Sequence, residues 1–124
     1  MYNFTVVNRY NNTMMQSPLP PDAAELIAGR FRALADPTRL RIVDQLRRKD
    51  EVSVGELTET LGTSQQNVSK HLAALRAEGF VARRKQGTSS LYRIADPAVL
   101  ELCDRLCEAM ESQLATLGSM LASR

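Results

Sequence analysis

The sequence predicts a mainly α-helical domain with one small β-hairpin, and three observations support this fold class. The chain has 124 residues, of which 44% are hydrophobic and 24% charged, as expected for a single soluble globular domain. Apolar residues recur at helical spacing through most of the chain. After Gly79 the pattern changes to two strand-like segments around a polar turn. No apolar run reaches the roughly 18 residues that cross a membrane, so we expect a cytoplasmic protein.

The N-terminal arm, residues 1–21, is predicted to be flexible or loosely docked, because it carries one charge and ends in the stiff segment SPLPP. The core, residues 22–95, begins with a helix that Asp22 and Glu25 are expected to cap. The apolar side of this helix consists of Leu26, Ile27, Phe31 and Leu34.

Asp36 and Pro37 are predicted to start a second helix. An aspartate side chain can accept hydrogen bonds from the free amides of a helix start, and proline suits the first helical position. This helix runs to about Arg48. By its spacing it is expected to bury Leu40, Val43 and Leu46.

Two further helices follow with only about three residues between them. Ser53 and Glu56 have the spacing of a capping box for the first, which ends at Gly62. The second, residues 63–78, is capped by its initial Thr-Ser pair. This short connection is typical of a helix-turn-helix motif.

A two-stranded hairpin with a basic tip is predicted next, with strands over residues 80–84 and 91–94 around a turn over 85–90. An Asp-Pro pair at 96–97 then starts a last helix that runs to about Ala122. In the order α-α-α-α-β-β-α, these elements make a winged helix-turn-helix.

The net charge of +2 conceals an uneven distribution. Residues 63–93 carry six basic residues and one acidic residue, whereas residues 94–124 carry two basic and five acidic ones. A basic block of this kind favours a polyanionic partner.

The helix over residues 63–78 has one apolar side, formed by Val68, Leu72 and Leu75, which is expected to pack on the domain. Its opposite side suits double-stranded DNA, because Gln and Asn can pair with adenine edges, Ser can reach a base or phosphate, and Lys neutralises phosphate. The wing, residues 80–94, can follow the backbone or enter the minor groove. The predicted DNA-contacting residues are Gln66, Asn67, Ser69, Lys70, Arg83, Arg84 and Lys85.

An enzyme is not indicated. His71 is the single histidine, and its position beside the packed side of its helix favours a structural hydrogen bond. The sequence contains no Gly-rich phosphate loop, no Cys/His cluster at zinc spacing and no nucleophile elbow. The alternative to a DNA-binding protein is a winged-helix module that binds protein and uses its basic wing for solubility.

An apolar stripe with steps of three and four residues runs along the last helix, residues 96–124. A domain of this size cannot cover the distal half of the stripe, so we expect this segment to be a dimerisation helix in a homodimer. The predicted interface consists of Leu100, Cys103, Cys107, Met110, Leu114, Leu117 and Leu121.

Cys103 and Cys107 allow two interpretations. Two thiolates one helical turn apart can bind a soft metal ion, or As(III) with a third ligand, in a metal- or thiol-responsive protein. Both cysteines also belong to the apolar stripe, where a buried cysteine acts as a small hydrophobic residue. We favour the second interpretation and expect no metal or other cofactor.

Four stretches closely resemble the ArsR/SmtB family of bacterial winged-helix repressors: FRALADPTRLRI at 31–42, VGEL at 54–57, SQQNVSKHL at 64–72 and the wing segment 87–94. The resemblance covers about residues 24–112. It implies a homodimer built on the first and last helices, which binds an inverted-repeat operator and blocks transcription until an unidentified effector arrives. Carried over by position, it adds three DNA contacts: Ser64, Gln65 and Thr88.

The metal sites of that family do not carry over. Ser53 and Gly55 stand where its arsenic-type site has cysteines at the start of the third helix. Asp96 matches the acidic ligand of its zinc-type site, but the other three places are taken by Ala98, Ala109 and Ser112.

Overall fold

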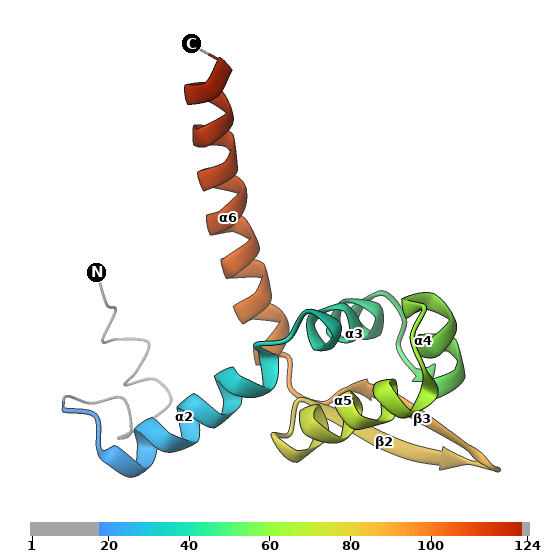
Figure 1. Ribbon diagram of the computed structural model, residues 1–124. Coiled ribbons are helices and arrows are strands. Elements are labelled where there is room, and N and C mark those ends of the chain that lie inside the picture. Colours follow the sequence, from blue (N-terminus) through green and yellow to red (C-terminus); the bar gives the residue numbers. More distant parts are fainter. Residues whose placement is uncertain (1–17, 123–124) are drawn as a thin grey trace.

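The computed structural model describes residues 18–122, which form a winged helix-turn-helix core from which one long helix projects (Figure 1). The predicted order of helices and hairpin is confirmed, with one additional short strand. The elements are α2 (Pro21–Leu34), α3 (Pro37–Arg48), β1 (Val52–Ser53), α4 (Val54–Leu61), α5 (Gln65–Ala77), β2 (Val81–Gln86), β3 (Ser89–Ile94) and α6 (Ala98–Ala122). The predicted arm lies outside the described residues up to residue 17. Among the described helices, none has the length and apolar character that crossing a membrane requires.

Two helix starts form as predicted. The Asp36 carboxylate accepts a hydrogen bond from the Arg39 amide at 3.0 Å at the start of α3. Ser53 and Glu56 form a reciprocal capping box at the start of α4, and Gly62 follows its last residue with a φ of 68°. Glycine reaches this left-handed conformation without steric cost, so the helix-turn-helix connection closes in three residues.

The predicted cap of α2 is wrong. The helix begins at Pro21, and Pro20 occupies the N-cap position without a side-chain hydrogen bond. Asp22 therefore falls inside the first turn, where its charge interacts favourably with the free amides. Proline at the first helical position sets this start, because the amide hydrogen that it lacks would have had no partner in the helix.

The wing is a tighter hairpin than predicted. Strands β2 and β3 pair as far as Gln86 with Ser89, so the turn consists of two residues and not of the six over 85–90. Gly87 has a φ of 63°, the conformation that a two-residue hairpin turn requires.

Strand β1 completes an antiparallel sheet in the order β1-β3-β2. It pairs Val52 with Tyr92 and Ser53 with Leu91. A strand of two residues is too short to show an alternating pattern, which is why the sequence did not indicate it. This pairing fastens the base of the wing to the start of α4.

The hydrophobic core lies between α3, α4, α5 and the sheet. The predicted packing side of α5 is confirmed, since Val68, Leu72 and Leu75 are fully buried. The prediction for α3 is wrong for Leu40, which is 44% exposed, whereas Ile42 is fully buried. The stripe of α3 that faces the core is thus rotated from the predicted one, and Leu40 lines a groove against α6.

Helix α6 leaves the core after its first turns (Figure 1). Val99 is buried, Cys103 is half-buried, and every described residue beyond Cys103 is exposed. Arg47 of α3 fastens the base of α6. One of its guanidinium nitrogens lies 2.6 Å from the Asp104 carboxylate, and another donates to the Leu100 carbonyl at 3.1 Å.

Candidate nucleic-acid interface

The start of α5 is held in place by local hydrogen bonds. The Ser64 hydroxyl oxygen accepts from the Asn67 amide at 3.1 Å, and the Asn67 side chain donates to the Thr63 hydroxyl at 3.1 Å. These bonds order the turn after α4 and define the direction in which α5 begins.

The side of α5 opposite its buried residues is open to solvent. Gln65, Gln66, Ser69 and Lys70 are all exposed, whereas Asn67 is half-buried. Amide, hydroxyl and ammonium groups presented from one rigid helix can form hydrogen bonds with base edges and phosphates. The structure therefore places four of the predicted helix residues, all except Ser64 and Asn67, together on one accessible side of α5.

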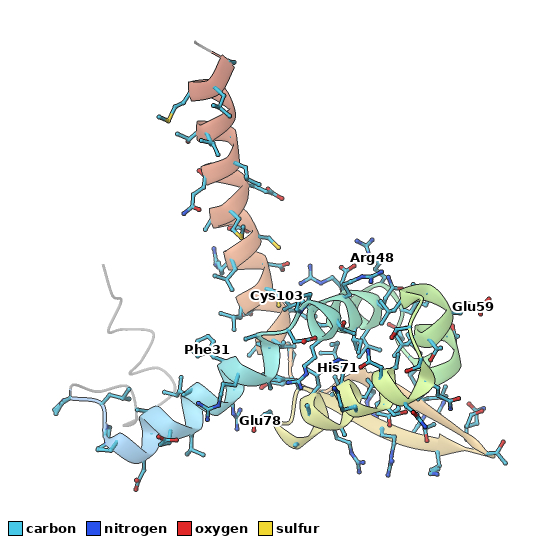
Figure 2. The ribbon with its side chains drawn as sticks, in the orientation of Figure 1. Phe31, Arg48, Glu59, His71, Glu78 and Cys103 are labelled. Atoms are coloured by element: carbon cyan, nitrogen blue, oxygen red, sulfur yellow. The ribbon has the colours of Figure 1, made fainter. Side chains whose placement is uncertain are left out.

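His71 joins α5 to α3 (Figure 2). Its ring is buried, and its Nδ1 accepts a hydrogen bond from Arg39 Nε at 3.0 Å. The Asp36 carboxylate lies 3.8 Å from the same nitrogen. The predicted structural role of His71 is confirmed. Burial lowers the pKa of His71, while the nearby Asp36 carboxylate acts in the opposite direction.

This pKa shift predicts a loss of stability in mild acid. Because the folded state disfavours the charged ring, the contribution of His71 is complete above the ordinary pKa of about 6.5 and decreases as the pH falls below it. We expect the urea midpoint to decrease between pH 7 and about 5.5. His71→Gln, which keeps an acceptor for Arg39 but does not titrate, should have a nearly flat midpoint over this interval. The chain has one histidine, so an equal decrease in both proteins would contradict the assignment.

Adjacent arginines of the wing lie on opposite faces of β2. Arg83 is opposite the buried Tyr92 and lines the space between the sheet and α5. Arg84 lies on the other face, where its Nε and Nη2 each donate to the Glu51 carboxylate at 2.7 Å. This bidentate pair lowers the pKa of Glu51. The DNA contact predicted for Arg84 stays a prediction, and its guanidinium is engaged by Glu51.

A groove of about 500 Å³ separates α5 from the wing. It brings together four of the predicted DNA-contacting residues, two from the helix and two from the wing: Gln65, Ser69, Arg83 and Thr88. Gln66 and Lys70 do not line it and lie further round α5, and Lys85 is exposed near the wing tip.

One groove residue was missed by the sequence reasoning. Arg76 lies in the last turn of α5 and lines the same groove as Gln65 and Ser69. It follows these residues by eleven and seven positions, the spacing of one helix face. That spacing could have identified Arg76, but the prediction considered only the first two turns.

The stripe along α6 divides into two parts. Leu100 and Cys103 pack against the core of their own chain. The remaining members are exposed: Cys107, Met110, Leu114, Leu117 and Leu121.

The two cysteines have different surroundings. Cys103 is half-buried, and burial raises the pKa of its thiol, which reduces the reactive thiolate fraction. Cys107 is exposed. Within residues 18–122, no group of three or more His, Cys, Asp and Glu residues is arranged to hold a metal ion. Sensing at Cys103 and Cys107 stays an untested alternative.

Comparison with known proteins finds close relatives. A family model described as a helix-turn-helix domain matches residues 34–84. The nodulation protein NolR of Rhizobium meliloti is 39% identical over 103 residues, which cover 81% of this chain and 82% of NolR. The crystal structure of Rv0081 from Mycobacterium tuberculosis has a TM-score of 0.70 at 35% identity and covers 77% of this chain and 95% of that one. The solution structure of a homodimeric winged helix-turn-helix DNA-binding domain from Mycobacterium bovis, a possible ArsR-family transcriptional regulator, has a TM-score of 0.70 at 30% identity and covers 80% and 91%.

A helix-turn-helix whose second helix presents a polar face beside a basic hairpin defines a winged-helix DNA-binding protein. The similarity to these relatives extends over most of both chains. The chain belongs to the ArsR/SmtB family of winged helix-turn-helix transcriptional repressors. The resemblance seen in the sequence is thus confirmed, and related proteins are named as transcriptional regulators and not as enzymes.

Proposed function

We propose that this protein is a homodimeric repressor that binds an inverted-repeat operator until an effector weakens that binding. Each protomer would place α5 in the major groove and the wing against the adjacent minor groove. The observation that carries this proposal is the accessible polar face of α5 beside a basic wing. Six basic residues within 63–93 supply the electrostatic attraction.

The predicted contacts divide by chemistry. Gln65, Gln66 and Asn67 would read base edges, while Lys70 would neutralise a phosphate. Ser64 and Asn67 also form the hydrogen bonds at the start of α5. In these bonds the Ser64 hydroxyl acts as an acceptor and the Asn67 side-chain NH₂ group as a donor, so the Ser64 hydroxyl hydrogen and the Asn67 side-chain carbonyl would be the groups that contact DNA. The hydroxyl groups and the wing cations would bind the backbone. These backbone contacts would come from Ser69, Arg83, Lys85 and Thr88.

The homodimer is supported by the apolar surface of the first and last helices. On α6, Leu114 is 61% and Leu117 51% exposed, and on α2, Leu26 is 61% and Phe31 52% exposed. Phe31 lies on the side of α2 from which α6 projects (Figure 2). A twofold partner that covers these residues would also bring two recognition helices to two half-sites.

The test is DNA binding measured by fluorescence anisotropy on the promoter of the protein's own gene, over a series of salt concentrations. A repressor should prefer this duplex to a scrambled one. The logarithm of its affinity should decrease linearly with the logarithm of the salt concentration. A winged-helix module that binds protein would show neither preference nor slope. That result would exclude the repressor.

Gln66→Ala should relax base preference. We expect operator affinity to decrease by about 1–3 kcal/mol because one bidentate base contact is lost, while affinity for a scrambled duplex changes little. The measurement is anisotropy on both duplexes at one salt concentration, with circular dichroism to establish that the variant is folded. An equal loss on both duplexes would contradict the base-reading role of this exposed side chain.

A further inference from the structure

A phosphate backbone has to pass through the groove between α5 and the wing if the protein binds DNA as proposed. In B-DNA, the major groove and the adjacent minor groove are separated by one backbone strand. A protein with a helix in the first groove and a hairpin on the second therefore straddles that strand. The groove between these two elements has a volume of about 500 Å³ and opens beside both.

Two arginines line this groove from opposite sides. Arg76 belongs to the last turn of α5, and Arg83 lies on the α5-facing side of β2. Both are exposed, and neither forms an ion pair with an acidic residue in the part of the chain that the structure describes. An exposed guanidinium without an acidic partner is available to bind a phosphate in bidentate fashion.

Arg84 differs from both. Its two hydrogen bonds to Glu51 join the residue before β1 to β2, on either side of the central strand β3. To bind a phosphate, it would have to give up a bidentate ion pair at 2.7 Å. Such a pair restrains the hairpin relative to the core and neutralises the guanidinium that it holds.

We propose that Arg76 is an additional phosphate-binding residue of this chain. Together with Arg83 it holds the backbone strand that passes between α5 and the wing. Arg84 is a positioning residue that braces the wing through Glu51 and does not bind the backbone. The proposal rests on the proposed function, because the ligand of the groove is the DNA phosphodiester backbone.

The experiment compares the salt dependence of binding for four proteins on the operator and on a scrambled duplex. These are the wild type, Arg76→Gln, Arg83→Gln and the double variant Glu51→Gln/Arg84→Gln. The double variant is the matched control, since it removes an arginine of the wing without changing the net charge. The slope of log K against log salt is negative, and each lost phosphate contact makes it shallower by about 0.9.

We expect Arg76→Gln and Arg83→Gln each to reduce the magnitude of this slope by about 0.9. Each should also weaken binding to both duplexes alike. The double variant should keep the wild-type slope. An unchanged slope for Arg76→Gln, or a loss of about 0.9 in the double variant, would overturn the assignment. If the wild type itself shows no salt-dependent DNA binding, the proposed function fails, and this inference fails with it.

Discussion

Replacement of both Leu114 and Leu117 by glutamate is expected to yield a monomer whose operator affinity is about 10²–10⁴-fold lower than that of the wild type. Both leucines are more than half exposed on the projecting part of α6. In the proposed dimer, their burial links two DNA-binding units, so that binding at one half-site makes binding at the second intramolecular. Two carboxylates in the centre of this interface would be desolvated without partners.

The molecular mass measured by light scattering and the affinity measured by anisotropy together check this result. The matched control is Ala115→Glu with Ser119→Glu, which adds the same charge on the opposite side of α6, where both positions are exposed. The control should remain a dimer with wild-type affinity. If the leucine variant is a dimer, or if the control also dissociates, the proposed interface is wrong.

Leu72→Ala should lower the free energy of unfolding by about 2–5 kcal/mol. Leu72 is a residue of α5 and is fully buried, so its truncation leaves a cavity between this helix and the rest of the core. The measurement is urea unfolding at a fixed protein concentration, because unfolding of a dimer depends on concentration.

Leu91→Ala is the control for this prediction. Leu91 is next to the buried Tyr92 on β3 and therefore lies on the opposite face of this strand, where it is only half-buried. Its truncation should lower the free energy of unfolding by about 1 kcal/mol. Equal losses in the two variants would contradict the placement of the core beneath α5.

The parts of the fold that were predicted correctly depend on interactions within a few residues. Asp36 caps α3 from three positions away, and Ser53 and Glu56 cap α4 across the same interval. The buried side of α5 was predicted equally well, because one helix face carries its large apolar residues, Val68, Leu72 and Leu75. Local hydrogen bonding and helical periodicity are therefore enough to define the order of the elements.

Two errors are local, the cap of α2 and the length of the wing turn. Others concern groups that are distant in the sequence. Arg84 finds Glu51 across 33 positions, and Arg39 finds His71 across 32. Spacing cannot indicate such pairs, because they depend on how the sheet and helices are packed. The outward orientation of Leu40 has the same origin, since α3 touches both the core and α6 and periodicity alone does not say which side faces which.

Helix α3 also connects the two proposed binding surfaces of each protomer. Near its first turn Arg39 bonds to His71 of α5, and in its last turn Arg47 bonds to the base of α6. These two residues are eight positions apart on one continuous helix, or about 12 Å. The proposed recognition helix α5 and the proposed dimerisation helix α6 are thus both bonded to one continuous helix. In a twofold dimer, the separation of the two recognition helices is then a fixed length, and it dictates the number of base pairs between operator half-sites.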